Sequence, residues 1–475
     1  MEIWKVERDS DEPVYRQLVR RVREAVLAGA LAPGYQMPTE HALARRLEVA
    51  RSTVTAAYNE LKAQGYLEAT AGRGTFVARE PAGEPLWWGS CLARTEEVPG
   101  DPLTEKSTPA LVSFMHGNPP VDVVPVSDFR DAVGEAAADP DSYSFSPPMG
   151  DLQLREALAP ISAERLGRPV AADEVLITSG VQHALHLVAR LLVEPGDHVA
   201  MPAVTYYGAS VAFRDAGARI LTLDTSPGEL DVDRLAGLLT RGRIRAVYVN
   251  PLHGNPFGVS LSEGTRRALG DLGARYRVPI IEDESYAFLS AGRYSPPPIA
   301  AGSPPGAVVP VWSVSKPLAP GVRLGWLVAP PAVVSALAII QRDQLLHPGT
   351  LMQRALARFV ASSRWETHVE RVRTAFAARR RVSVDLLRQG LPPGFKMTSP
   401  DGGLFAWAAL PRGVREHSFL QSALASGVAF APGRSFLADP SDPEPGGMRL
   451  NVVWNDAATV REGIRRLGEA LELAA

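Results

Sequence analysis

The sequence is poor in cysteine, in long apolar runs and in net charge, and each shortage excludes a class of protein. Cys91 is the single cysteine among 475 residues, so the chain cannot form an internal disulfide or a cysteine-based zinc site. The most apolar long run, residues 324–340, is interrupted by Pro330 and Pro331, which indicates a strand, a turn and a buried helix rather than a membrane span. No signal peptide begins the chain. We expect a cytoplasmic protein without membrane association or a metal site.

The net charge of −2 is too small to identify a partner by bulk electrostatics. Residues 1–79 hold 12 Lys and Arg against 10 Asp and Glu, a charge of +2, which leaves −4 for the rest. DNA binding must therefore be argued from a residue pattern. The length, with 45% hydrophobic and 21% charged residues, suits two or three globular domains.

The first eighty residues carry the pattern of a winged helix-turn-helix. Apolar residues recur at helical spacing over 13–30, and two short helices follow, which we expect Thr39 and Ser52 to cap. After Gly65, two β-strands are expected on either side of a glycine-rich turn at 71–74. Helix, helix-turn-helix and β-wing together predict a winged helix.

Residues that can contact DNA gather at the start of the second short helix and at the tip of the wing. Free backbone N–H groups, hydroxyls and a guanidinium at a helix N-terminus can all bind phosphate, and an arginine at the wing tip can reach phosphate or the minor groove. The alternative is a helical hairpin whose solvated residues contact another protein. We favour DNA, with the candidate contacts Thr39, His41, Arg51, Ser52, Thr53 and Arg73.

This segment resembles the GntR family of bacterial regulators. The stretch YRQLVRRVREAVLAGALAPGYQMPTEHALARRLEVARSTVTAAYNELKAQGYLEATAGRGTFV follows the family's order of features, and the resemblance covers residues 13–79. His41 stands where the family usually has an arginine, and Thr55 stands where arginine is frequent in the recognition helix. The resemblance implies double-stranded DNA as a partner and leaves the operator sequence open.

Residues 80–112 lose periodicity and contain five prolines, which predicts a linker between a DNA-binding domain at 1–79 and a second domain at 113–475. Trp87 and Trp88 are unusual in a free linker. Docking of these rings on one of the domains and a linker without such contacts both remain open.

Beyond residue 113, short apolar segments rich in β-branched residues alternate with longer amphipathic ones. The expected strands lie in EVLITSG, HVAMPAV, RAVYVNP, VPIIEDE and AVVPVWSVS. Apolar strands alternating with helices predict an α/β domain whose mostly parallel sheet is covered on both faces. Polar residues fall where these strands end, which is the edge at which such sheets bind ligands.

The residues at these strand ends can together hold a phosphorylated aldehyde. Lys316, which we expect to end a strand, offers an amine for a Schiff base, and Asp283 can pair with a protonated ring nitrogen. Asn255 and Tyr286 can hydrogen-bond a phenolic oxygen. Backbone N–H groups at a strand-to-helix turn, an arginine and two serines can hold phosphate, namely Gly180, Val181, Gln182, Arg323, Ser313 and Ser315. Aldehyde, pyridinium, phenol and phosphate together describe pyridoxal 5′-phosphate (PLP).

Each of these residues alone is commonplace, as a surface lysine, a strand cap or a turn, but their order carries a resemblance. Residues 113–475 resemble the fold-type I aminotransferases, through the motifs TSGVQHAL, HGNPFG, EDESY, SVSKPLAPGVRLGW, GGLFAW and MRLNVVW. The resemblance implies Lys316 as the aldimine lysine and Tyr206 as the residue that stacks on the cofactor ring. It also implies Arg449 as the partner of an amino acid's α-carboxylate, although an arginine here can equally form a surface ion pair.

One position departs from the aminotransferase pattern. Phe145 stands where the family commonly has a tyrosine whose hydroxyl reaches the cofactor phosphate of the partner subunit. Either Tyr143 supplies that hydroxyl or the phosphate is held less tightly.

A GntR winged helix followed by an aminotransferase-like domain resembles the MocR subgroup of regulators. The expected fold is therefore multidomain, a winged helix-turn-helix plus an α/β fold-type I PLP-binding domain. The resemblance implies a homodimer, and a domain-swapped arrangement of its subunits remains open. We favour a transcriptional regulator that senses PLP or an amino compound through an aldimine at Lys316. An active aminotransferase with an appended DNA-binding domain and a regulator that reads PLP alone remain alternatives.

Overall fold

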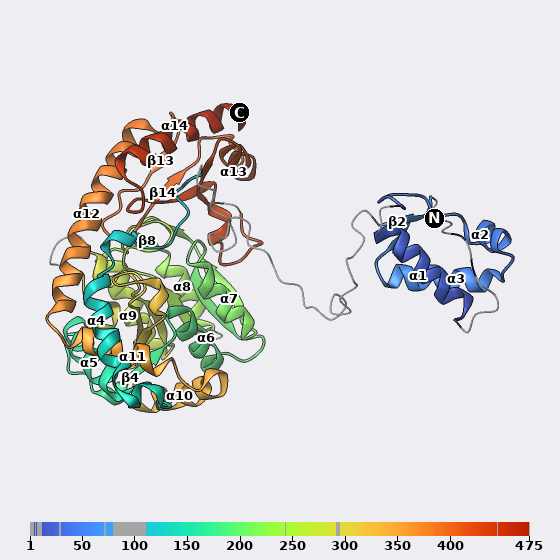
Figure 1. The fold of residues 1–475 in the computed structure, drawn as a ribbon. Coiled ribbons are helices and arrows are strands. Elements are labelled where there is room, and N and C mark those ends of the chain that lie inside the picture. The colour runs from blue at the N-terminus through green and yellow to red at the C-terminus, as the bar shows by residue number, and fades with distance from the viewer. Residues whose placement is uncertain are drawn as a thin grey trace. The chain divides into compact units, whose positions relative to one another are not determined.

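The chain divides into two compact units, Met1–Glu97 and Val98–Ala475, which are described separately (Figure 1). The computed structural model describes residues 4, 6, 12–27, 30–70, 73–78, 111–242, 244–290, 295–443 and 445–474. The expected linker therefore lies outside the described residues except at its end, and so do Trp87 and Trp88. Its last residue belongs to the first strand of the second unit, β3 (Val112–Ser113).

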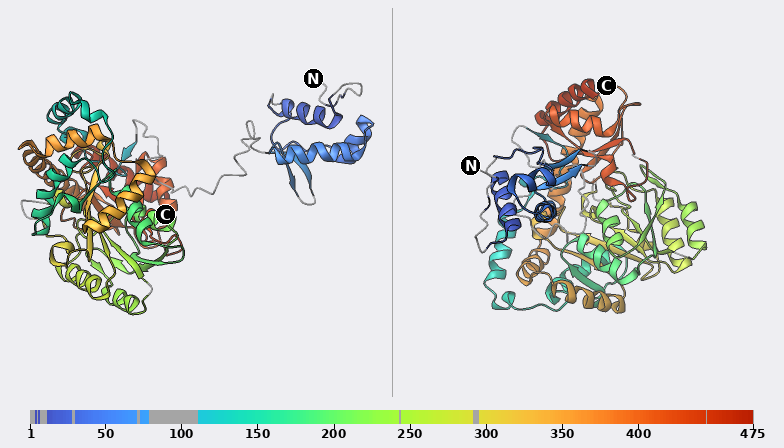
Figure 2. Two further views of the ribbon diagram at one scale, coloured as in Figure 1. Left: turned by 90° about the horizontal axis from the view of Figure 1, so that it is seen from below. Right: turned by 90° about the vertical axis from the view of Figure 1, so that its right-hand side faces the viewer.

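The N-terminal unit is a three-helix winged helix-turn-helix whose two-stranded antiparallel wing projects from the helices (Figure 2). Its elements are α1 (Val14–Leu27), α2 (Glu40–Leu47), α3 (Arg51–Ala63), β1 (Leu67–Thr70) and β2 (Gly74–Val77). The apolar positions predicted to face inward do so, and Leu18, Val22, Leu43, Val54 and Leu61 are each at most 1% exposed. These side chains form one core that joins all three helices.

One of the two predicted helix caps is confirmed and the other is wrong. Thr39 caps α2, because its Oγ1 accepts a hydrogen bond from the backbone N–H of Ala42 at 3.2 Å. Ser52 does not cap α3, because the helix begins at Arg51 and Ala50 occupies the N-cap without a side-chain hydrogen bond. Ser52 instead lies in the first turn of α3 with its side chain exposed.

The C-terminal unit is built on a seven-stranded sheet in the order β4–β12–β11–β10–β9–β5–β6. Six strands share one direction, and β12 runs antiparallel to both of its neighbours. The strands are β4 (Val175–Thr178), β5 (His198–Pro202), β6 (Arg219–Leu223), β9 (Ile244–Val249), β10 (Ile280–Asp283), β11 (Val308–Ser313) and β12 (Gly325–Val328). The five predicted strand segments form β4, β5, β9, β10 and β11, which confirms a mostly parallel sheet.

Helices cover both faces of this sheet. Since alternate residues of a strand point to opposite sides, neighbouring residues of one strand pack against different layers. Leu176, Tyr248 and Ile281 face one layer, α6, α7 and α10, whereas Val247 and Ile280 face α8 and α9 on the other side. On that second side, α5 and α11 cover the β4 end of the sheet. The helices are α5 (Leu152–Leu166), α6 (Val181–Leu192), α7 (Tyr207–Asp215), α8 (Val232–Thr240), α9 (Glu263–Tyr276), α10 (Pro331–Leu345) and α11 (Thr350–Val360).

The apolar run at 324–340 forms β12 and the first part of α10, as predicted. In the part of the chain that the structure describes, no helix is both long and apolar enough to cross a membrane.

A smaller antiparallel sheet, β13–β14–β17–β16, packs with three helices around an apolar cluster of its own. Most of these elements lie at the end of the unit opposite to α10, although the helix α12 extends from there along the unit (Figure 1). They are β13 (Lys396–Met397), β14 (Phe405–Ala409), β16 (Ala431–Pro432), β17 (Gly447–Asn451), α12 (Arg364–Gly390), α13 (Glu416–Ala425) and α14 (Ala457–Ala474). We call this part the small subdomain and the part around the seven-stranded sheet the large subdomain.

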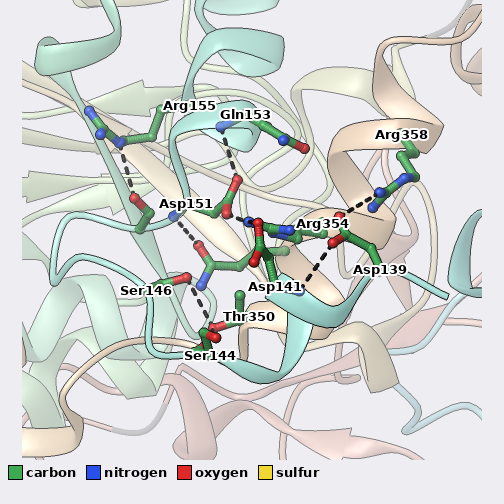
Figure 3. A network of polar contacts seen from close by, with 12 residues as sticks. Asp139, Asp141, Ser144, Ser146, Asp151, Gln153, Arg155, Thr350, Arg354 and Arg358 are labelled. Carbon is green, nitrogen blue, oxygen red and sulfur yellow. Dashed lines mark hydrogen bonds and ion pairs between the residues drawn. The ribbon is translucent and has the colours of Figure 1, made fainter. Parts of the chain in front are cut away.

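A polar network fixes the segment 139–151 against α11 (Figure 3). The guanidinium of Arg354 lies 2.7 Å from Asp139 Oδ2 and 3.2 Å from Asp151 Oδ2. The backbone N–H of Asp151 donates to Gln353 Oε1 at 2.8 Å. Because Arg354 is mostly buried, these contacts fix the segment firmly.

Candidate functional site

Lys316 lies in a turn after β11, and the prediction that it ends the strand is wrong because β11 stops at Ser313. Its Nζ donates a hydrogen bond to the backbone oxygen of Gly117 at 2.7 Å. Burial, together with the nearby charge of Arg449, lowers the pKa of Lys316 to about 8, although Asp283 opposes the shift. A lysine with such a pKa has a substantial neutral, nucleophilic fraction near pH 8.

Asp283 ends β10 as predicted and is 3% exposed. Its Oδ2 accepts a hydrogen bond from the Tyr248 hydroxyl at 2.9 Å, and its Oδ1 accepts from the backbone N–H of Ser285 at 3.0 Å. Burial raises the pKa of Asp283, whereas the hydrogen bonds and the charge of Lys316 lower it. The carboxylate is thus fixed in orientation and suited to pair with a cationic ring nitrogen.

Arg449, on β17, is buried among aromatic rings. Its Nη2 donates to the backbone oxygen of Met115 at 2.6 Å and its Nη1 to Asn255 Oδ1 at 3.0 Å. Its Cζ lies 4.1 Å from the ring centre of Phe405 and 4.8 Å from that of Phe436. With 5% exposure, Arg449 does not form the surface ion pair that the sequence left open.

The buried Nε of Arg449 has no hydrogen-bond partner among the residues described. Burial also lowers the pKa of this guanidinium to about 10. A buried guanidinium with an unpartnered N–H indicates a site for an anion.

Asn255 and Tyr286 are both buried beside this arginine. The Asn255 side-chain oxygen accepts from Arg449, so its Nδ2 is the group able to donate to a phenolic oxygen. The Tyr286 ring packs on Phe405, with ring centres 5.9 Å apart. Burial raises the pKa of the Tyr286 hydroxyl, and the nearby charge of Asp283 adds to this increase.

Gly180, Val181 and Gln182 occupy the turn from β4 into α6, as predicted. Gly180 is the N-cap, with φ of 95°, and no side chain caps α6. A Cβ added at Gly180 would lie 3.3 Å from Arg323 Nη2, so the guanidinium lies beside the helix N-terminus. Helix N–H groups and a guanidinium at one point form a cradle for phosphate.

Tyr206 lies in the segment between β5 and α7. Its hydroxyl donates to Gln182 Oε1 at 2.9 Å, and Gln182 Nε2 donates to the backbone oxygen of Gly208 at 2.8 Å. Burial raises the pKa of Tyr206, Asp283 raises it further, and Arg323 and Arg449 lower it, so this ring lies among the other predicted residues. 

Ser313 and Ser315 are both buried, and their hydroxyl oxygens lie 2.9 Å apart. Ser313 Oγ also accepts a hydrogen bond from the backbone N–H of Ser315 at 3.0 Å. The two serines therefore brace the turn that leads to Lys316.

The sequence did not reveal a buried chain of hydrogen bonds that supports the loop of Asn255. His253, which is 2% exposed, places Nδ1 2.7 Å from Asp401 Oδ1 and Nε2 2.9 Å from Ser290 Oγ. Because Ser290 is also 2% exposed, this Ser-His-Asp arrangement links the large and small subdomains and does not present a nucleophile. His253 precedes Asn255 by two residues and therefore positions the cofactor loop.

Most of the predicted DNA contacts are exposed on the N-terminal unit, including Thr39, His41, Ser52 and Arg73, whereas Thr53 is half-buried. The Arg51 side chain is 70% exposed, and its Nε lies 3.6 Å from Glu40 Oε2. The same carboxylate accepts a hydrogen bond from Thr55 Oγ1 at 2.8 Å. Thr55, at a position where the family often has arginine, thus contacts α2 through this hydrogen bond.

Comparisons with known proteins agree with the folds of both the N-terminal and the C-terminal unit. Residues 110–467 match the family described as aminotransferase class I and II, and residues 14–77 match the bacterial regulatory proteins of the gntR family. The probable rhizopine catabolism regulatory protein MocR of Rhizobium meliloti is 30% identical, over 98% of this chain and 95% of that protein. The regulator TauR of Rhodobacter capsulatus is 30% identical over 96% of both chains.

This chain belongs to the class I and II aminotransferases and is a MocR-type regulator. Its C-terminal unit is also similar to solved aminotransferases. The α-aminoadipate aminotransferase LysN of Thermus thermophilus shares 29% identity, with a TM-score of 0.73 and coverage of 82% of this chain and 98% of that chain. The multiple substrate aminotransferase of Thermococcus profundus shares 27% identity, with a TM-score of 0.74, over 82% and 98%. The cofactor of this MocR-type regulator is PLP.

The residues present fit this cofactor. A buried amine, a buried carboxylate, an aromatic ring and a helix N-terminus with a guanidinium lie near one another, because Asp283 and Lys316 shift each other's pKa and Asp283 and Arg323 both influence the pKa of Tyr206. The orphaned Nε of Arg449 shows that the site is complementary to an anion as well.

The lowered pKa of Lys316 predicts a pH dependence for capture of PLP by the cofactor-free regulator. Because only the neutral amine attacks an aldehyde, the rate is expected to rise up to about pH 8 and then level off, with a fall of about tenfold per pH unit below that value. Asp283→Asn removes the charge that raises the pKa of Lys316, so the midpoint is expected to move to lower pH. Stopped-flow absorbance measures this rate, with N-α-acetyl-lysine as the reference amine. A Lys316 midpoint equal to that of the free amine would contradict the assignment.

Proposed function

We propose that this MocR-type regulator binds PLP at Lys316 and alters its affinity for DNA when a small molecule changes the occupancy of that site. The observation that carries the proposal is the cluster of buried, mutually perturbed groups around Lys316 in a chain that also carries a winged helix. Burial of a lysine, an aspartate and an arginine next to one another costs free energy, and such clusters of ionisable groups are typical of functional sites.

Each residue has a role in holding the cofactor. Asp283 pairs with the ring nitrogen, Tyr206 stacks on the ring, and Asn255 and Tyr286 donate to the phenolic oxygen. The phosphate lies in the cradle formed by Gly180, Val181, Gln182 and Arg323, with Ser313 and Ser315 supporting the neighbouring turn. When bound, PLP supplies an aldehyde that reacts reversibly with amines.

The effector we propose is an amino compound that carries a carboxylate. The buried guanidinium of Arg449 lacks a partner for its Nε, which a carboxylate would satisfy. Such a ligand regulates DNA binding only if its affinity differs between two conformations of the regulator.

A working aminotransferase is the second candidate, and the neutral fraction of Lys316 near pH 8 favours it. An amine that can also shuttle a proton would permit turnover of a bound amino acid. Release of more than one equivalent of keto acid per site, with an amino donor and a keto-acid acceptor both present, supports catalysis, whereas binding without such release supports a sensor.

The N-terminal unit is a DNA-binding domain of the GntR family. We propose that the start of α3 contacts the operator, because Arg51 is exposed there and held toward α2 only by a 3.6 Å ion pair with Glu40. An exposed ion pair of this length costs little to exchange for a DNA phosphate or base edge.

Arg51→Ala is therefore expected to weaken DNA binding, by about 1–3 kcal/mol if the guanidinium makes a bidentate base contact. The control is Arg20→Ala, which removes an exposed arginine of α1 that pairs with Glu12. Fluorescence anisotropy at one salt concentration, with DNA from upstream of the regulator's own gene, measures both affinities. Equal losses in the two variants would remove Arg51 from the interface.

We propose further that the regulator is a homodimer through the surface around Phe145. Phe145 is 83% exposed, Tyr143 is 71% exposed and Leu346 is 52% exposed. Phe145 packs edge-on against His347, with ring centres 5.7 Å apart, so these residues form one patch. The Tyr143 hydroxyl donates to the backbone oxygen of Ala137 at 2.9 Å. Apolar side chains exposed on a segment as firmly held as 139–151 are typical of an interface.

Phe145→Asp is expected to shift the protein toward the monomer, because a carboxylate would be buried without a partner in the interface. Val382→Asp is the matched control, since Val382 on α12 is also an exposed apolar side chain, at 42%. Sedimentation velocity over a concentration series measures the equilibrium. A Phe145→Asp protein that sediments like the control would place the interface elsewhere.

A further inference from the structure

A cavity of about 730 Å³ lies beside the cofactor site, between the large and small subdomains. One wall comes from β6, the segment after it and α8, and the other from β13, β14, Leu437, Asp442, Pro443 and Pro445. Small-molecule sites commonly have volumes of about 300–1,000 Å³ and lie where two structural parts meet. The cavity has the size and the location of a ligand site.

Two loops contribute one side chain to the cavity and another to the cofactor site. In the segment after β5, Val204 lines the cavity and Tyr206, two residues later, lies at the cofactor site. In the HGNPFG loop, Phe257 lines the cavity and Asn255 binds Arg449. A shift of either loop on one side therefore moves a residue on the other.

The small subdomain connects the two spaces in the same way. Trp407 lines the cavity and is the direct cross-strand partner of Arg449, which places the two side chains on one face of the sheet. Leu437 lines the cavity, and Phe436 before it packs over the Arg449 guanidinium. Four separate segments thus couple the cavity to the cofactor site.

The more buried side chains that line the cavity include two aromatic residues. Phe257 and Trp407 meet edge to face, with ring centres 5.3 Å apart, and Met397 lies on the same wall. Phe257 and Met397 are only half-buried, so apolar surface remains available to a ligand. An aromatic ring is the group that gains most from contact with such a surface.

The more exposed side chains that line the cavity carry charges of both signs. Arg234 and Asp224 pair with each other at 3.7 Å. Lys396 and Asp442 also line the cavity, and neither forms an ion pair within the described parts of the chain. One unpaired cation and one unpaired anion are complementary to a zwitterion.

We propose that this cavity is a second ligand site, which binds an aromatic α-amino acid. The ring lies against Phe257 and Trp407, the carboxylate lies toward Lys396 and the ammonium toward Asp442. Because the ligand contacts both subdomains, it stabilises one arrangement of them and changes the cofactor site through the four shared segments. Binding at this site is independent of the proposed function, and only its regulatory consequence rests on it.

The test is calorimetric titration of L-phenylalanine into the full-length protein in two forms. One form is cofactor-free, and the other is loaded with PLP and reduced with borohydride, which blocks reaction of an amine at Lys316. We expect binding in both forms, with a dissociation constant that differs between them, because coupling between two sites is reciprocal. Lys396→Glu is expected to weaken binding about tenfold, whereas Arg412→Glu, which reverses an exposed charge outside the cavity on the same subdomain, leaves it unchanged.

A second comparison tests the ammonium contact. The wild type is expected to prefer L-phenylalanine over 3-phenylpropionate, which lacks the amine, and Asp442→Asn is expected to abolish this preference. Thermal melting of each variant verifies folding. The proposal is overturned if the reduced protein does not bind L-phenylalanine, or if Lys396→Glu binds it like the wild type. Failure of PLP to bind would contradict the proposed function alone, because the cofactor-free titration tests the cavity directly.

Discussion

The site depends on an excess of buried positive charge. Lys316 and Arg449 are buried near each other, Asp283 is the carboxylate that acts on Lys316 among the described residues, and burial lowers the pKa values of both cations. Taking cations out of water costs free energy unless anions compensate them. The protein alone does not supply that compensation, since Arg449 keeps an unpartnered Nε. A ligand with a phosphate and a carboxylate would supply it, so we propose that the buried cations select a ligand of this chemistry.

The rest of the C-terminal unit serves to hold these charges in place. The parallel sheet brings Asp283 and the α6 N-terminus to one edge, and the small subdomain supplies Arg449 from the opposite side. His253 joins the two parts, because its ring bonds to Asp401 of the small subdomain while its own loop carries Asn255. The same two-sided construction leaves the aromatic cavity next to the cofactor site. An arrangement that depends on two subdomains is sensitive to their relative position, which is the property that a sensor needs.

Much of the fold and several site residues could be predicted from the sequence, because a strand and its end are specified by residues that are neighbours in the chain. Strands such as VPIIEDE are apolar runs that end in a polar residue, and that pattern placed Asp283 at the strand end correctly. The Ser52 cap was wrong because side-chain preference favours serine at an N-cap, whereas α3 begins at Arg51, with Ala50 at the N-cap and no side-chain cap. Lys316 was placed at a strand end because serine and valine do not reveal where pairing with β12 stops.

Other features depend on residues distant in the sequence. Asp401 follows His253 by 148 positions, and nothing near either residue indicates the contact. Tyr248 was one aromatic residue in an apolar strand, and only the pairing of β9 with β10 shows that its hydroxyl bonds to Asp283. The cavity beside the cofactor site likewise appears only when four segments are folded together.

The central claim is that occupancy of the Lys316 site controls DNA binding. The most direct measurement is a titration of DNA from upstream of the regulator's own gene at one salt concentration, since phosphate contacts make affinity salt-dependent. Wild type and Lys316→Ala are compared without PLP, with PLP, and with PLP plus a mixture of the twenty amino acids. We predict that the dissociation constant of the wild type changes in at least one of these states and that Lys316→Ala does not respond. Equal affinities of the wild type in all three states, or an unaltered response of Lys316→Ala, would contradict the account.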